Sequence, residues 1–169
     1  MHTDELLLGA FANVHDAVHR AVDGASGATL AYRPDDGSNS VAWLVWHLAR
    51  IQDDHVADVA GTEQAWTADG WGGRFDLPFD ATETGYGAKP EDVAALSGAT
   101  ADLLTGYYDA VHQRTLDYVR GLSDEDLDRV VDIRWDPPVT LGVRLTSVIT
   151  DDLEHAGQAA YVRGVAERR

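Results

Sequence analysis

Apolar residues recur at helical spacing in four long runs of the sequence, and this periodicity restricts the fold more than any other feature. In the first run they recur three or four residues apart, at Leu7, Phe11, Val14 and Val18. Side chains with this spacing share one face of an α-helix, and that face must be buried against another element. The four runs are residues 3–23, 39–60, 100–120 and 140–168. The sequence therefore predicts an all-α fold, a four-helix bundle.

The bundle is expected to form a single domain over residues 1–169. A chain of 169 residues is long enough to bury a substantial core. The sequence contains no internal repeat, no low-complexity tract and no linker-like stretch that would divide it. One domain is therefore the simplest interpretation.

Local signals place the ends of the second run and predict one further element. Ser38 or Asn39 is the expected N-cap of the second helix, because short polar side chains cap helix starts. Gly61 is its expected end, because glycine tolerates the left-handed backbone that terminates a helix. Residues 130–135 and 138–141 have strand character on either side of a proline-containing turn. We therefore expect a small hairpin before the last helix.

A long crossover, residues 61–89, joins the second and third helices. A connection of this length is uncommon in a compact domain and is often functional. It is rich in glycine and contains five aromatic residues: Trp66, Trp71, Phe75, Phe79 and Tyr86. Two interpretations are open. Either the aromatic residues line a pocket, which would include Trp66 and Trp71, or they anchor the crossover against the bundle.

The charge balance excludes some classes of partner. The chain has 29 acidic and 13 basic residues, which gives a formal net charge of −16. Nucleic acids and anionic membrane surfaces both require a basic footprint, so neither is expected as a partner. The amino-terminal residues lack the pattern of a signal peptide, and the longest apolar stretch, around Trp43, is too short to span a membrane. A cytoplasmic protein is the expectation.

The sequence contains no cysteine, which restricts the chemistry further. Disulfides, a thiol nucleophile and thiolate metal ligands are all excluded. Any metal must therefore bind to histidine, aspartate or glutamate.

Three residues best fit a metal site: His47, Asp151 and His155. Asp151 and His155 are four positions apart on the last helix, so they point to the same side. That face also carries apolar residues and is expected to face the core, as is His47 in the second helix. Buried polar groups are costly without partners, and two imidazoles with one carboxylate would suit a divalent metal with one position free. The alternative is a local Asp151–His155 hydrogen bond beside a satisfied core histidine.

The other histidines are assigned lesser roles. His55 lies two turns beyond the expected ligand of the second helix and is expected in a pocket, not as a ligand. His15 and His19 form another i, i+4 pair at the edge of the first apolar stripe, without a role unless the fold brings them to the predicted ligands. His2 and His112 are expected at the surface.

Two motifs together resemble the DinB-like superfamily. The first runs Asn39-Ser-Val-Ala-Trp-Leu-Val-Trp-His47-Leu-Ala-Arg50, and the second runs Asp151-Asp-Leu-Glu-His155-Ala-Gly-Gln158. They occur in this order about a hundred residues apart, in a chain of the right length. In detail they look like the mycothiol transferase branch, which was once catalogued as a domain of unknown function and is related to mycothiol-dependent maleylpyruvate isomerase.

This resemblance implies one divalent metal, Zn²⁺ or alternatively Ni²⁺, held by His47, Asp151 and His155. The middle ligand is His in many members and Glu in the isomerase type. Asp151 has a shorter side chain than Glu, so direct binding and binding through a water molecule are both open. Trp43 and Gln158, which lie in the two motifs, are expected to line the pocket with His55, Trp66 and Trp71.

The implied function is a metal-dependent thiol S-transferase. A low-molecular-weight thiol, mycothiol in this branch, would be activated as a metal-bound thiolate and attack an electrophilic small molecule. No catalytic residue is expected beyond the metal site. Two alternatives are a thiol-dependent isomerase of the maleylpyruvate type and a non-catalytic metal-binding or structural bundle. A homodimer is compatible with each of these functions.

Overall fold

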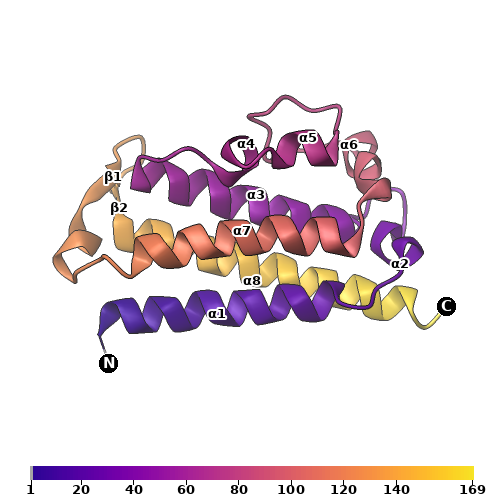
Figure 1. Ribbon diagram of the computed structural model, residues 1–169, viewed down its shortest axis with the longest axis horizontal. Helices are drawn as coiled ribbons and strands as arrows, with labels where there is room; N and C mark the ends of the chain where they lie inside the picture. The colour runs from indigo at the N-terminus through magenta and orange to yellow at the C-terminus, as the bar shows by residue number, and fades with distance from the viewer. Residues whose placement is uncertain (1) are drawn as a thin grey trace.

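The computed structural model describes residues 2–169 and is an all-α bundle, which confirms the predicted fold class. Its four long helices, each of 19 to 26 residues, are α1 (Thr3–Val22), α3 (Val41–Ala60), α7 (Ala101–Val119) and α8 (Leu141–Ala166). Helices α1 and α8 run in one direction and α3 and α7 in the other (Figure 1). Helix α3 packs against α7 and α8, and α1 packs against the same two helices. Across residues 2–169, none of the helices has the length and apolarity that a membrane span requires.

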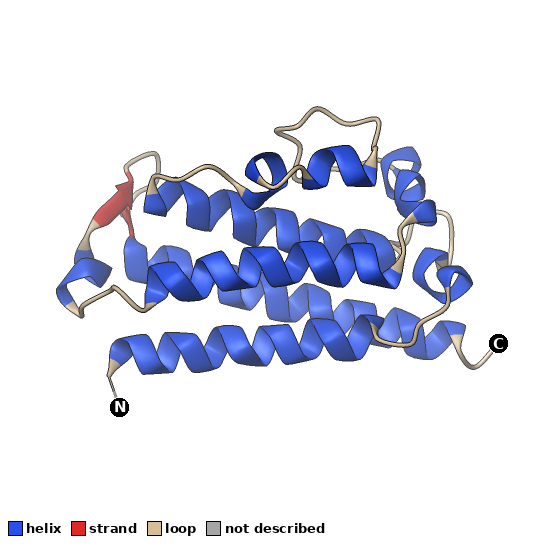
Figure 2. Ribbon diagram, viewed as in Figure 1, coloured by secondary structure: helices blue, strands red, loops and turns tan. Residues whose placement is uncertain are grey.

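The shorter elements lie at the two ends of the bundle and in the crossover (Figure 2). They are α2 (Gly27–Ala31), α4 (Ala65–Ala68), α5 (Trp71–Phe75), α6 (Pro90–Ala95), the 3₁₀ turns η1 (Leu96–Gly98) and η2 (Glu125–Asp128), and the strands β1 (Val130–Asp132) and β2 (Val139–Thr140). The strands pair antiparallel, Val130 opposite Thr140, directly before α8. The predicted hairpin is therefore present.

Helix α3 begins one residue later than the sequence indicated. Its N-cap is Ser40, whose hydroxyl oxygen accepts a hydrogen bond from the Trp43 amide at 3.2 Å. Ser38 is engaged in the preceding turn, where its hydroxyl donates to Asp35 at 2.7 Å, so it cannot cap the helix. The predicted end is confirmed, because Gly61 follows the helix with a left-handed φ of 67°.

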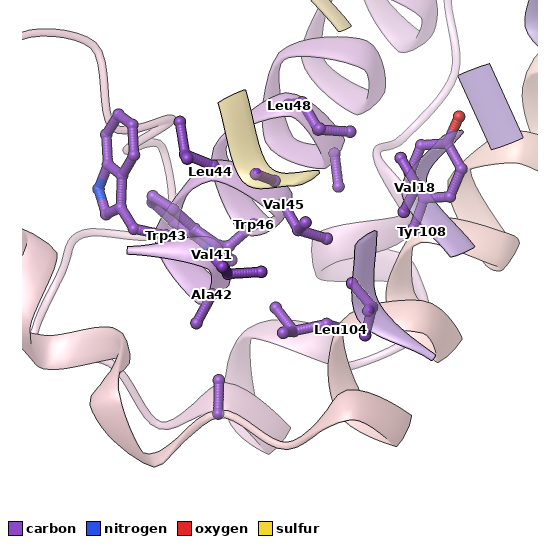
Figure 3. Close-up of a cluster of buried hydrophobic side chains, with 14 of the residues drawn as sticks. Val18, Val41, Ala42, Trp43, Leu44, Val45, Trp46, Leu48, Leu104 and Tyr108 are labelled. Atoms are coloured by element: carbon purple, nitrogen blue, oxygen red, sulfur yellow. The ribbon is translucent and has the colours of Figure 1, made fainter. Parts of the chain in front are cut away.

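Helix α3 is the central element of the core. Every residue from 41 to 50 is buried, including Arg50. Trp43 and Trp46 lie in the cluster of buried apolar side chains that Figure 3 shows. A helix without a polar face must be covered on all sides. Here α7 and α8 cover the inner sides, and the crossover covers the outer side, packing Phe79 against Trp46 at a ring-centroid distance of 5.6 Å.

Aromatic residues anchor the crossover to the bundle, which is the second of the two interpretations above. Trp66 and Phe75 are buried, and both pack against the ring of Tyr107 from α7, at centroid distances of 5.2 and 5.9 Å. Trp71 and Phe79 are partly buried against the same cluster. Tyr86 is the exception, because 90% of its surface is exposed.

Two charged side chains of α3 fix the crossover as well. The guanidinium of Arg50 is fully buried and donates hydrogen bonds to the main-chain oxygens of Ala81 and Glu83, at 3.3 and 3.1 Å. The carboxylate of Asp53 accepts from the Ala65 and Trp66 amides, both at 2.8 Å, at the start of α4. Buried charged groups with these partners hold both ends of the segment against α3.

Candidate metal centre

His47 on α3 meets Asp151 and His155 of α8 where these two helices pack together. Each residue offers a ligand atom that lies within 4.8 Å of those of the other two. The rings of His47 and His155 have centroids 4.9 Å apart and are nearly perpendicular, at 71°. Among the residues that the structure describes, no other His, Asp or Glu joins these three in the group.

The ring of His47 is held in the orientation and tautomer of a metal ligand. Its Nδ1 donates a hydrogen bond to the main-chain oxygen of Thr84 at 2.6 Å, and a carbonyl oxygen can only accept. Nε2 is therefore left as the nitrogen with a free lone pair. Burial lowers the pKa of His47, which favours the neutral, ligating form. The Trp43 ring stacks on the imidazole at a centroid distance of 4.6 Å.

His155 is oriented in the same way from α8. Its Nδ1 lies 3.2 Å from the carboxamide oxygen of Gln158, which can only accept a hydrogen bond. This leaves Nε2 as the free nitrogen, on the side of Asp151. A partner on the far ring nitrogen is the usual arrangement around a metal-binding histidine.

One carboxylate oxygen of Asp151 lacks the partner that a buried polar atom normally has. Its Oδ1 is 3.6 Å from Nε2 of His155, which is too long for a hydrogen bond. Its Oδ2 is inaccessible to solvent and has no hydrogen-bond partner among residues 2–169. The alternative of a local Asp151–His155 hydrogen bond is therefore not found. A cation shared with the two histidines would satisfy this oxygen, so the donor set fits the metal implied by the family resemblance.

Gly85 allows the crossover to close directly over His47. Its φ of +91° is unfavourable for residues with a side chain. A Cβ atom at this position would lie 2.9 Å from the Trp46 ring and 3.0 Å from Nδ1 of His47. The glycine therefore lets the preceding carbonyl, that of Thr84, reach the imidazole. Neither residue was predicted from the sequence, because Gly85 is one of several glycines in the crossover and Thr84 belongs to neither motif.

The position of Asp151 corrects one sequence-based expectation. The side chains of Asp151 and His155 are 39% and 19% exposed, so they lie at the edge of the core-facing side of α8. The buried acid is its neighbour Asp152, which lies between Val148 and Ala156 on the buried stripe. Each residue turns a helix by about 100°, so one position separates edge from core.

Asp152 itself is a buried carboxyl group with an altered acidity. Burial raises the pKa of Asp152 well above its usual value. Neither of its oxygens has a hydrogen-bond partner within residues 2–169. Burial therefore favours the neutral over the charged form of this carboxyl group.

The predicted pocket residues fall into three places. Trp43 and Gln158 contact the ligands, as described above. Trp66 and Trp71 belong to the aromatic anchor around Tyr107, the second at a centroid distance of 5.8 Å. The remaining residue, His55, is hydrogen-bonded neither to the candidate ligands nor to the aromatic anchor. Its Nδ1 lies 2.8 Å from a guanidinium nitrogen of Arg144 on α8.

An open depression adjoins the centre on the side of Gln158. It has a volume of about 650 Å³ and lies between the start of α3 and the second half of α8. Leu44, one turn before His47, and the exposed side chain of Tyr161 line it. None of the three candidate ligands lines the depression, and Gln158 is the residue that connects it to the centre.

The remaining histidines lie away from the candidate centre. His112 is half-buried where the sequence placed it at the surface: its Nδ1 is inaccessible to solvent, and burial lowers the pKa of its imidazole to about 4. The sequence could not show that Tyr108 and His15 pack on its ring, at centroid distances of 6.0 and 4.6 Å. His15 and His19 do not approach His47 and lie instead on the opposite seam of the bundle.

Comparisons with known proteins place this geometry in context. The family model described as the DinB superfamily matches residues 10–159. A crystal structure described as that of the conserved protein of locus from Enterococcus faecalis superposes with a TM-score of 0.92. It shares 30% sequence identity and the match covers 100% of this chain and 99% of that one. No curated protein matches the sequence.

Proposed function

The chain belongs to the DinB superfamily, whose members often bind metals, and on this premise we propose that it is a divalent-metal-dependent thiol S-transferase. The superfamily match confirms the broader resemblance, and the mycothiol transferase branch stays a prediction. The observation that carries the proposal is the meeting of two free imidazole nitrogens with an unpartnered carboxylate oxygen.

The metal would be held by Nε2 of His47, Nε2 of His155 and the carboxylate of Asp151. Two nitrogens and one oxygen suit Zn²⁺ in a catalytic site, where three protein ligands leave a coordination position for substrate. Ni²⁺ also accepts imidazole and carboxylate ligands and is the alternative. His55 pairs with Arg144, so it does not act as a fourth ligand and does not occupy the coordination position left for substrate.

When bound, the ion would lower the pKa of an incoming thiol and so supply a thiolate near neutral pH. The protein has no cysteine, so the sulfur must come from a cosubstrate. Mycothiol is the thiol that we propose, from the resemblance of the two motifs. The electrophile would be a small molecule, for which the depression beside Gln158 offers space.

The residues around the ligands have positioning roles in this proposal. Thr84 and Gln158 hold the two imidazoles by their far nitrogens, at 2.6 and 3.2 Å. The stacked ring of Trp43 limits rotation of His47 and keeps water from one side of it. Fixed ligands keep their geometry when substrate enters, which is the advantage of such outer partners.

The test is metal analysis combined with a thiol-consumption assay on the untagged protein. We expect bound Zn²⁺ or Ni²⁺, and consumption of mycothiol in the presence of a generic electrophile such as monochlorobimane. A chelator should abolish the reaction and the added ion should restore it. Consumption that survives metal removal would contradict the proposal. Metal binding without consumption would favour the non-catalytic bundle, and isomerisation of maleylpyruvate without net thiol loss would favour the isomerase.

A further inference from the structure

A second cluster of metal-ligand residues lies on the seam between α1 and α7, away from the α3–α8 seam. His15 and His19 are on consecutive turns of α1, and Asp109 faces them from α7. Nε2 of His15 lies 3.0 Å, and Nε2 of His19 2.8 Å, from the same oxygen, Oδ1 of Asp109. The two imidazole rings have centroids 4.4 Å apart.

The surroundings of His19 call for a positive charge. Its Nδ1 is 3.3 Å from a carboxylate oxygen of Asp23, so both ring nitrogens face carboxylates. A neutral imidazole has one N–H and can donate to only one of them. The other nitrogen then presents its lone pair to a carboxylate oxygen. A second proton on the imidazole or a metal ion between the two groups would remove this conflict.

The arrangement is that of a metal site with an outer carboxylate. An N–H of His19 donated to Asp23 would leave Nε2 to bind an ion, as in carboxylate–histidine–zinc groupings. Donors of a tetrahedral ion with bonds of about 2.0–2.1 Å are separated by about 3.3 Å. The two distances from imidazole nitrogen to Asp109 Oδ1 would therefore have to increase by about 0.3 and 0.5 Å.

Neighbouring groups hold the cluster together and leave it accessible. The ring of His112 packs on that of His15 at a centroid distance of 4.6 Å, which restrains the orientation of His15. The side chains of His15, His19 and Asp109 are 32%, 26% and 49% exposed. An ion could therefore enter from solvent, and water could complete its coordination.

From these observations we propose that His15, His19 and Asp109 form a second divalent-metal site, independent of the candidate centre. Two imidazoles and a carboxylate select a borderline transition ion such as Zn²⁺, Ni²⁺ or Co²⁺ over Mg²⁺ or Ca²⁺. The ion would link α1 to α7, whose ligands are about ninety residues apart in the chain. It would stabilise the folded state, because the unfolded chain does not hold these ligands together.

The experiment is a Zn²⁺ titration of the chelator-stripped, untagged chain, with stoichiometry read by equilibrium dialysis. We expect about two equivalents for the unaltered protein, about one for His19→Gln and about one for His155→Ala. His55→Gln is the matched control, because it removes a half-buried histidine outside both clusters, and it should retain about two. These variants also separate the two sites. If only the second site binds Zn²⁺, the unaltered protein would bind about one equivalent, His19→Gln would lose it and His155→Ala would keep it.

Thermal unfolding distinguishes the ion from a second proton. His19→Gln keeps an amide that can hydrogen-bond to Asp109, so its metal-free melting temperature should stay close to that of the unaltered protein. The rise in melting temperature on adding Zn²⁺ should be smaller in this variant. Unchanged stoichiometry and an unchanged Zn²⁺-induced rise in His19→Gln would overturn the second site and leave a protonated histidine pair.

Discussion

The imidazole of His47 stands edge-on to that of His155, with ring centroids 4.9 Å apart, although the two residues are more than a hundred positions apart in the sequence. Each ring donates its Nδ1 proton to an oxygen outside the pair, from Thr84 and Gln158 respectively. The free nitrogens and the carboxylate of Asp151 therefore share one small volume.

Removing either imidazole should abolish tight binding at this centre. We expect His47→Ala and His155→Ala to lose more affinity than the roughly 10–100-fold that loss of an outer partner costs. His55→Ala is the control, because His55 lies on the same helix but pairs with Arg144. Metal content and circular dichroism should be measured together, since an unfolded variant would also lose its ion. Equal retention by all three variants would contradict the ligand assignment.

Asp151 offers the sharpest test of the donor set. If its carboxylate binds the ion, Asp151→Asn should weaken binding strongly, because the charge is removed at nearly constant shape. Asp151→Glu should be tolerated or bind more tightly if the short side chain limits reach. Metal titration of both variants separates the cases. Tight binding by the Asn variant and loss in the Glu variant would exclude Asp151 as a direct ligand.

Gly85 should be more sensitive than its neighbour Gly87. Both have positive φ, +91° and +72°, so alanine strains the backbone at either position by about 1–2 kcal/mol. Only at Gly85 would the new Cβ also collide with His47 and Trp46. We therefore expect Gly85→Ala to be less stable than Gly87→Ala in urea and to bind metal about 10–100-fold more weakly, by displacing the Thr84 carbonyl. Equal metal affinities of the two variants would show that this carbonyl does not matter.

The buried carboxylate of Asp132 should make stability depend on pH. Hydrogen bonds and charge from Arg134, and the charge of Arg144, lower the pKa of Asp132 far below its usual value. Because the pKa is lower in the folded state, the unfolded chain binds the proton more readily. This stabilisation therefore begins to fall as pH approaches the unfolded pKa of about 4, and it is lost only as pH falls toward the much lower pKa of the folded state.

Asp132→Asn should therefore melt below the unaltered protein at pH 7, and the gap should begin to narrow below about pH 5 and keep narrowing down to about pH 2. Melting temperatures across this range provide the measurement. Asp102→Asn, at an exposed site in the first turn of α7, controls for the general effect of acid. A gap that stays constant down to pH 3 would mean that Asp132 acts through shape and not through charge.

The sequence predicted the helices well because their signals are local. The apolar period, the glycine at position 61 and the proline-containing turn before α8 each act over a few neighbouring residues. The N-cap of α3 was misplaced by one residue, since Ser38, Asn39 and Ser40 are all capping residues. In the structure Ser40 accepts from the Trp43 amide, while Ser38 is engaged by Asp35.

The site was predictable only in part, for a related reason. A helical pitch of about 100° per residue leaves the boundary between core and edge uncertain by one position, so the sequence assigned Asp151 to the core where Asp152 lies. The contacts of Thr84 and Gly85 with His47 depend on how the crossover folds back. The sequence around Thr84 and Gly85 contains no pattern that predicts their contact with His47.

By itself, the sequence determined the all-α class, the four long helices, the hairpin and the residue types that could hold a metal, because each depends on local periodicity or on composition. Tertiary structure decided which of those residues meet. It brought His47 to His155, turned His55 to Arg144, and gathered His15 and His19 around Asp109. These pairings depend on which helix faces pack together, and that choice is made by the whole buried core, which no local stretch of sequence contains.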